Sequence, residues 1–270
     1  MAEISLDNPY FKELADEHRT WLASFDARHR DDWERLLNGN VEAACCEVAV
    51  RRLLESFGVA VEPNEQLRAD GGGPDFRCER NGTHFYTEVT CVLCATATSR
   101  TGISEEPSGF APFAPFGMTE AIFSECVGKA KQCRDMDAPT IVAVGTFHSF
   151  AAMTCFKKVI VSSVLTGKTQ MAWNIDISTG QQAGETYQLT ELKKAAFLKP
   201  DPQQEVGFAR SSISGLLLCG LGVSRCLGVL HPNPARSFDP TILQSVEFGR
   251  VELDRASRQL QVRWPNGGDE

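Results

Sequence analysis

Two carboxylic acids that a short hairpin would bring together are the residues of this chain best suited to chemistry. Asp75 precedes the dipeptide Asn81-Gly82 and Glu88 follows it, with strand-like residues on both sides. Asn-Gly is typical of a type I′ hairpin turn, because both central residues of that turn need a positive φ. A two-residue loop there places Arg80 opposite Thr83 and, further along the ladder, Asp75 opposite Glu88.

The predicted pairing of these acids indicates a metal site. Cross-strand neighbours have Cβ atoms about 5 Å apart, and two carboxylates at that distance repel each other by about 3 kcal/mol at an effective dielectric near 20. A divalent cation would remove this repulsion. Hard oxygen ligands suit Mg²⁺ or Mn²⁺, and such an ion can activate water and neutralise charge on a phosphoryl group. The alternative is a surface hairpin whose two acids are both solvated.

The alternation of residue types along the hairpin supports strands with two different faces. The face that we expect to form the site carries Asp75, Arg77, Tyr86, Glu88 and Thr90. The face that we expect to lie in the core carries Phe76, Cys78, Phe85, Thr87, Val89 and Cys91.

A helix predicted over residues 41–57, ending at Gly58, offers a third carboxylate. Glu42 projects near the middle of its apolar stripe and Glu47 at the border, so either side chain could reach toward the hairpin acids. Glu47 also starts an i, i+4, i+8 series with Arg51 and Glu55. The alternative for Glu47 is therefore an exposed ladder of ion pairs, each contributing a few tenths of a kcal/mol.

A second helix, predicted over residues 118–134, offers a cation. Lys129 lies on the same line as the apolar residues Ile122 and Cys126. Burying an unpaired ammonium is costly, so Lys129 either contacts the carboxylates or extends its stem toward water. Gln132 is a possible accessory residue of the same helix.

Composition limits the classes of protein to consider. The chain has 270 residues, 42% of them hydrophobic, and a net charge of −8. This length suits one large domain or a domain with an appendage, and the acidic balance argues against a stand-alone duplex binder. Arginines near the hairpin (Arg51, Arg52, Arg77, Arg80 and Arg100) could form a local basic patch or an ordinary solvated surface.

Localisation and cysteine use point to a reducing compartment. No apolar run is long enough for a membrane span, and the first residues lack a signal-peptide pattern, so we expect a cytoplasmic protein without a membrane partner. The ten cysteines are scattered, and we expect most to be buried as small apolar residues. We expect Cys91 and Cys94 to lie at the end of a strand rather than to bind a metal.

The remaining elements follow from periodicity and turn residues. Residues 8–38 read as amphipathic helix, 95–117 as a long insertion loop, and 167–187 as an irregular excursion. A helix is predicted over 150–165. Strands are predicted over 59–61, 140–147, 213–219, 226–230, 246–253 and 259–264.

In order along the chain, these features resemble the PD-(D/E)xK nuclease superfamily, which has the restriction-endonuclease-like fold. The matching order is a helix with Glu47, a strand with Pro74-Asp75, a strand with Glu88-Val89-Thr90, a helix with Lys129 and Gln132, and an apolar strand over Ile141–Val144. The chain looks most like an uncharacterised bacterial branch. The resemblance implies an α/β fold with a mixed central sheet flanked by helices. Residues 1–40 would be an N-terminal helical extension and 41–270 a single nuclease-like domain, with its core at 41–147 and further strands at its C-terminal end.

The resemblance also implies roles for the matching residues. Asp75 and Glu88 would bind the metal, with help from Glu47. The superfamily usually has a lysine two residues after the glutamate, where this chain has Thr90. A hydroxyl cannot supply positive charge, so Lys129 would have to supply it from the neighbouring helix.

Two hypotheses of different class follow. The first is a Mg²⁺-dependent (or Mn²⁺-dependent) nuclease that cuts phosphodiester bonds, most simply in DNA, with Thr90 bound to water. The second is a catalytically degenerate nuclease-fold module that binds nucleic acid or a protein partner. The distance from Lys129 to the acids discriminates between the two hypotheses.

Overall fold

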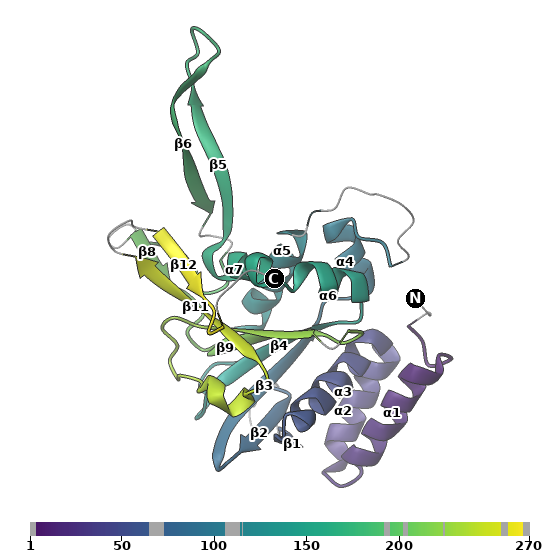
Figure 1. Cartoon of the computed structure of the whole chain (residues 1–270). Helices are drawn as coiled ribbons and strands as arrows, with labels where there is room; N and C mark the ends of the chain where they lie inside the picture. Colours follow the sequence, from purple (N-terminus) through teal and green to yellow (C-terminus); the bar gives the residue numbers. More distant parts are fainter. Residues whose placement is uncertain are drawn as a thin grey trace.

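The computed structural model describes residues 4–64, 73–105, 114, 116–191, 195–201, 205–223, 225–254 and 259–266. Its centre is a mixed sheet of eight strands (Figure 1). In spatial order these are β1 (Ala60–Pro63), β2 (Phe76–Arg80), β3 (Thr83–Cys91), β4 (Thr140–Thr146), β9 (Gly215–Gly220), β10 (Arg225–Leu230), β11 (Glu247–Asp254) and β12 (Gln259–Arg263). Strands β3, β4 and β9 run parallel, as do β10 and β11, and the other neighbouring pairs are antiparallel. The prediction of an α/β fold with a mixed central sheet flanked by helices is confirmed.

Helices cover both faces of this sheet (Figure 1). One face carries α1 (Pro9–Leu22), α2 (Ala27–Gly39) and α3 (Val41–Ser56). The other carries α4 (Cys94–Thr101), α5 (Phe116–Lys129), α6 (Ser149–Cys155) and α7 (Lys158–Thr166). Successive residues of a strand point to opposite faces, so Ala143 packs in the first core and Val144 in the second.

The first three helices pack as one unit with the sheet. Phe11, Leu14 and Leu37 belong to the same buried cluster as Val89 of β3. Helix α3 lies so close to β4 that a Cβ added at Gly145 would come within 2.5 Å of the Cys46 sulfur. Glycine is therefore required there for the helix to approach the sheet.

The β2–β3 hairpin has the predicted turn and register. Asn81 and Gly82 have φ angles of 53° and 73°, as a type I′ turn requires. Arg80 pairs with Thr83 and Phe76 with Thr87. Strand β2 begins at Phe76, so Asp75 lies one residue before the ladder, opposite Glu88 by continuation of the register.

Several predicted elements differ from the structure. Part of the predicted loop 95–117 is helix, because α4 spans Cys94–Thr101, and residues 106–113 and 115 lie outside the described residues. Helix α5 ends at Lys129 and a turn follows, so the helix predicted to reach residue 134 was too long. The helix predicted over 150–165 is broken into α6 and α7, which meet at 75°.

The predicted irregular excursion is instead a long hairpin of β5 (Lys168–Ile175) and β6 (Gln182–Glu191), which stands away from the body in Figure 1. In β5 the apolar residues Met171, Trp173 and Ile175 occupy every second position, so alternation was the available signal for this strand. A second small hairpin pairs β7 (Leu198–Asp201) with β8 (Glu205–Phe208), and a short 3₁₀ helix, η2, spans Pro240–Leu243.

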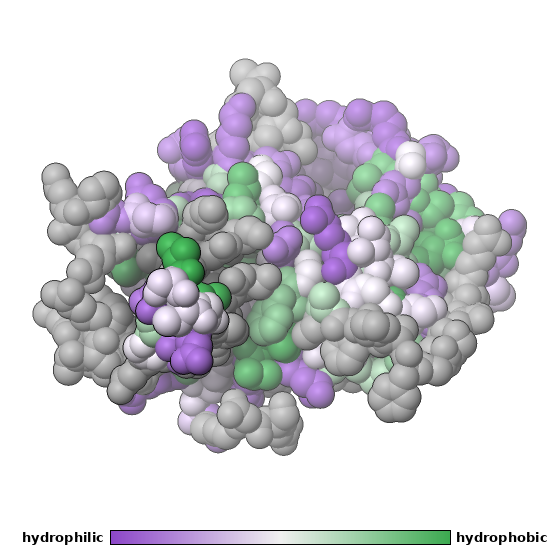
Figure 2. All heavy atoms as spheres, turned by 90° about the horizontal axis from the view of Figure 1, so that it is seen from above, coloured by the Kyte–Doolittle hydropathy of each residue, from purple (hydrophilic) through white to green (hydrophobic). Residues whose placement is uncertain are grey.

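Exposed apolar residues are distributed over several elements. Ile177, between β5 and β6, is 99% exposed, and Val159 of α7 is also exposed. Seen from above, hydrophobic residues form separate patches among hydrophilic ones (Figure 2). Among the described residues no single helix has the length and hydropathy to cross a membrane; the bent pair α6–α7 meets that criterion only when taken together.

Candidate functional site

The candidate site lies where β3 continues past the start of β2. Beyond Thr87, the edge of β3 has no β2 residue to pair with. The Asp75 carboxylate takes over there, because its Oδ2 accepts a hydrogen bond of 2.7 Å from the Val89 backbone N–H. The carbonyl of Asp75 in turn accepts from the Asn64 N–H at 2.9 Å. Asp75 is therefore held against the strand that carries Glu88.

Glu88 and Lys129 form the central ion pair of this site. The Lys129 Nζ donates to Glu88 Oε1 at 2.6 Å. The Glu88 side chain is fully buried, whereas that of Lys129 keeps 25% of its surface exposed. The structure thus selects the contact with the carboxylates over extension of Lys129 into water.

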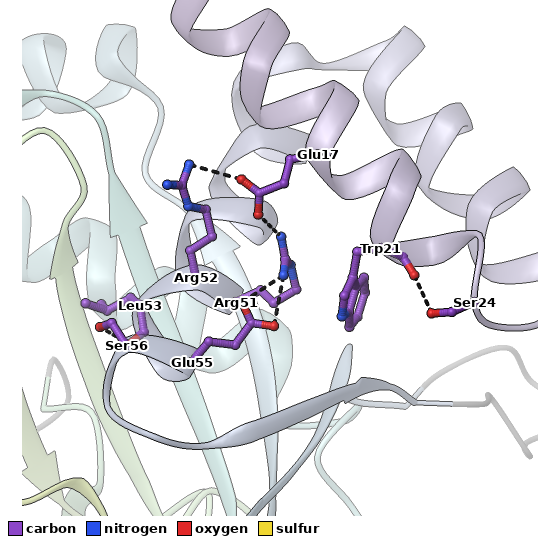
Figure 3. A network of polar contacts seen from close by, with 8 residues as sticks. All are labelled: Glu17, Trp21, Ser24, Arg51, Arg52, Leu53, Glu55 and Ser56. Carbon is purple, nitrogen blue, oxygen red and sulfur yellow. Dashed lines mark hydrogen bonds and ion pairs between the residues drawn. The ribbon is translucent and has the colours of Figure 1, made fainter.

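Glu47 joins the same electrostatic cluster from α3, on the other side of the hairpin. Burial raises the pKa of Glu47 well above its ordinary value, and the Asp75 carboxylate raises it further. The predicted ion-pair ladder through Glu47 is not the arrangement found. Arg51 instead bonds Glu55 at 2.8 Å and Glu17 at 2.6 Å (Figure 3).

The charges of the cluster act on one another in a consistent way. Burial and the Asp75 charge raise the pKa of Glu88, and the Lys129 ammonium opposes that rise. Burial also raises the pKa of Asp75, against the opposing effects of Lys129 and the Val89 N–H. Burial lowers the pKa of Lys129, but Glu88 and Asp75 more than compensate, so the pKa is raised. Three acids thus share one cation, and burial favours the protonated form of the acids that the cation does not balance.

The residues present fit a hard divalent cation. The second oxygen of Glu88, Oε2, is buried and has no hydrogen-bond partner among the described residues, which is costly for a carboxylate. All three acids supply the oxygen ligands that Mg²⁺ and Mn²⁺ prefer. Across the described ranges, no three His, Cys, Asp or Glu side chains stand preassembled as a metal-binding group. In this arrangement Lys129 and Val89 occupy one oxygen each of Glu88 and Asp75.

The common face of β3 predicted from alternation is present. Tyr86 donates its hydroxyl to Asp137 at 2.9 Å, and Thr90 donates to Glu125 Oε2 of α5 at 2.5 Å. Glu125 was not predicted as a site residue. Its position one turn before Lys129 was the available signal, since residues four apart share a helix face.

Two other predicted residues lie elsewhere. Glu42 Oε1 accepts a hydrogen bond of 2.7 Å from the Cys94 N–H. Glu42 therefore pairs with a backbone N–H at the start of α4 and does not join the carboxylate cluster. Gln132 lies in the turn after α5. Because α5 ends at Lys129, Gln132 does not share a helix face with Lys129 as predicted.

The arginines near the hairpin do not form one patch. Arg51 is buried in its own ion pairs. Arg80 donates to the Ile242 carbonyl at 2.5 Å, and Arg77 pairs with Glu62. The cysteines are all free, and eight of the ten, Cys94 among them, are buried, as expected for small apolar residues.

A pocket of about 360 Å³ opens beside the carboxylates. Asp75 and Glu47 line it together with residues of α1 and α2, among them His18, Trp21 and Trp33. The two N-terminal helices therefore contribute a wall to the candidate site, which the sequence did not indicate.

Comparisons with protein-family models, with curated proteins and with solved structures found no match for this chain.

Proposed function

We propose that this protein is a divalent-metal-dependent nuclease that hydrolyses phosphodiester bonds in DNA. The observation that carries the proposal is the 2.6 Å contact between Lys129 and the fully buried Glu88, next to the half-buried carboxylates of Glu47 and Asp75. The predicted discriminator was the distance from Lys129 to these acids, and a converged cluster favours an enzyme over a binding module.

The order of elements supports a restriction-endonuclease-like core. Helix α3 carries Glu47, Asp75 precedes β2, Glu88 lies on β3 and Lys129 ends α5, which leads to the parallel strand β4. The resemblance seen in the sequence implies the same order. Helix α4 is an addition between β3 and α5.

Each side chain has a role that its contacts support. Asp75, Glu88 and Glu47 would hold Mg²⁺ or Mn²⁺, which would act as a Lewis acid on the phosphoryl group and on water when bound. Lys129 places a fixed positive charge beside Glu88, where it would stabilise negative charge that develops on the phosphoryl oxygens. The Val89 N–H keeps the Asp75 carboxylate in place.

Thr90 departs from the lysine of the superfamily, and Lys129 takes over its charge from α5. The Thr90 hydroxyl donates to Glu125, which leaves its oxygen lone pairs to accept a hydrogen bond from water. We therefore assign Thr90 the role of binding water near the metal, rather than that of a charged catalytic group.

The alternative is a catalytically degenerate module that binds nucleic acid or a protein partner. The Thr90–Glu125 hydrogen bond favours this module. The Thr90 hydroxyl donates to a carboxylate, whereas the lysine that the superfamily usually has at this position would direct a positive charge at the substrate. The net charge of −8 also fits weak duplex binding.

A cleavage assay tests the proposal. Plasmid, single-stranded DNA and RNA are incubated with Mg²⁺, with Mn²⁺ and with chelator. We expect metal-dependent cleavage of DNA by the natural chain and none by Asp75→Ala, with both proteins folded by circular dichroism. Glu55→Gln is the matched control, because Glu55 lies on α3 outside the cluster. Cleavage that survives in Asp75→Ala would remove the proposal, and binding without cleavage would favour the module.

A further inference from the structure

We propose that the pocket between the α1–α2 helices and the start of β2 binds an unpaired nucleobase next to the scissile phosphate. The substrate would then be a single strand, or a strand with an extruded nucleotide, rather than an intact duplex. This inference rests on the proposed nuclease function, but its test separates the two.

The pocket lies beside the carboxylates of the candidate site. Asp75 and Glu47 line the pocket on one side, so a group bound inside it lies beside the carboxylates of the site. The volume of about 360 Å³ falls within the range of small-ligand pockets, roughly 300 to 1,000 Å³. A nucleotide whose phosphate faced Asp75 could place its base there.

The wall of the pocket is aromatic. His18 stacks on Trp21, with ring centroids 5.0 Å apart and planes at 27°. It also contacts Trp33, at a centroid distance of 4.7 Å. All three side chains line the pocket. His18 and Trp33 are buried, and the guanidinium carbon of Arg51 lies 4.8 Å from the centroid of the half-buried Trp21 ring. The remaining exposed part of Trp21 is therefore the aromatic surface that a base outside the helical stack would contact.

His18 supplies the polar group that calls for a ligand. Its side chain is 2% exposed, and its Nδ1 is buried without a hydrogen-bond partner in the described part of the chain. Burial and the nearby Arg51 charge lower the pKa of His18 to about 3, so the ring is neutral at neutral pH. A neutral imidazole suits the donor or acceptor edge of a base better than it suits a phosphate.

Base pairing excludes an intact duplex from this arrangement. A base inside a duplex has both faces stacked and its Watson–Crick edge paired, so it cannot enter a pocket lined by side chains. The cost of extrusion is smallest for a base that is already unpaired. The pocket therefore selects single-stranded or locally opened nucleic acid.

Binding to a series of short single-stranded oligonucleotides, each with one abasic site, tests the inference. Affinity is measured by fluorescence anisotropy, once in CaCl₂ and once in EDTA. For the natural chain, we expect one abasic position to weaken binding by about 5- to 100-fold, and we expect duplex DNA to bind more weakly than the intact strand.

Variants locate the base in the pocket. His18→Phe keeps the aromatic packing but removes the ring nitrogens, so we expect it to weaken binding of the intact oligonucleotide by about 5- to 30-fold. It should leave the sensitive abasic oligonucleotide unchanged. His29→Ala, at a half-buried position that also lines the pocket, gives a second test if His18→Phe does not fold. His84→Phe is the control, because His84 lies on β3 beside Tyr86 and does not line the pocket.

The outcomes distinguish the two proposals. An abasic scan without a sensitive position, or equal affinity for duplex and single strand, overturns the pocket assignment even if Asp75-dependent cleavage is found. A sensitive position that is lost in His18→Phe supports the assignment even if no cleavage occurs. Absence of nucleic-acid binding in both buffers overturns both.

Discussion

Neutralising Glu47 should make the protein more stable, although Glu47 belongs to the proposed site. Its carboxylate is only partly exposed and lies near the Asp75 and Glu88 charges, which raise its pKa together with burial. The folded protein therefore retains a proton on Glu47 at pH values where the unfolded chain has lost it. Stability must then fall as pH rises above about 4.5, the ordinary pKa, by about 1.4 kcal/mol per pH unit until the folded pKa is passed.

The size of the gain in Glu47→Gln follows from the same charges. Burial and the Asp75 charge raise the pKa of Glu47, and the Lys129 charge offsets part of that rise. Each unit by which folding raises this pKa is worth about 1.4 kcal/mol. We expect Glu47→Gln to raise the free energy of unfolding by about 2 kcal/mol at pH 8 and to change it little at pH 4.5. Urea unfolding in EDTA at both pH values measures the difference.

A matched variant on the same helix should have the opposite effect. Glu55 bonds the buried Arg51 at 2.8 Å (Figure 3), so Glu55→Gln should lower the free energy of unfolding by about 1 kcal/mol. Added MgCl₂ should stabilise the natural chain at pH 8 more than it stabilises Glu47→Gln. A destabilised Glu47→Gln, or a gain that is the same at both pH values, would refute this account of the cluster.

Other predictions concern neighbouring groups. Lys129→Met should cost about 1 to 3 kcal/mol at pH 8, because it removes the hydrogen bond from the ammonium to the buried Glu88 carboxylate. Burial raises the pKa of Glu88 to about 8, so Glu88 can take up a proton in the variant, and this limits the cost. Adding Glu88→Gln should restore most of that loss in urea unfolding, but should not restore cleavage. His231 is buried and its pKa is lowered to about 4, so the unfolded chain takes up a proton below pH 6.5 that the folded chain does not. His231→Phe should therefore reduce the loss of stability between pH 6.5 and pH 5 by about 2 kcal/mol, and an unchanged difference would contradict the burial argument. Glu42→Ala should cost about 1 kcal/mol by removing the acceptor at the start of α4, without changing the stabilisation by MgCl₂ in a thermal melt.

Short-range information was sufficient for the hairpin and for several other elements. The positive φ demanded at Asn81-Gly82 defines the turn, and a two-residue turn defines the register of every pair above it. Strand alternation then places Glu88 and Thr90 on one face. Helical periodicity likewise placed Lys129 on a buried line. Each of these properties depends on residues close together in the chain, so each can be predicted from the sequence alone.

Contacts between distant segments were decided only by the tertiary structure. Periodicity allowed both Glu42 and Glu47 to reach the hairpin, but the packing of α3 directs Glu42 to the Cys94 N–H and Glu47 to the carboxylates. The same packing pairs Lys129 with Glu88, where the sequence left extension into water equally open.

The wall of the pocket was also invisible in the sequence. His18 lies on α1, far along the chain from Asp75, and its aromatic neighbours belong to a segment whose pattern indicates only an amphipathic helix. The residues of this chain determine which groups can carry charge and which faces they occupy. Which of those faces meet depends on how helices and sheet share their buried surface, and that is a property of the whole fold.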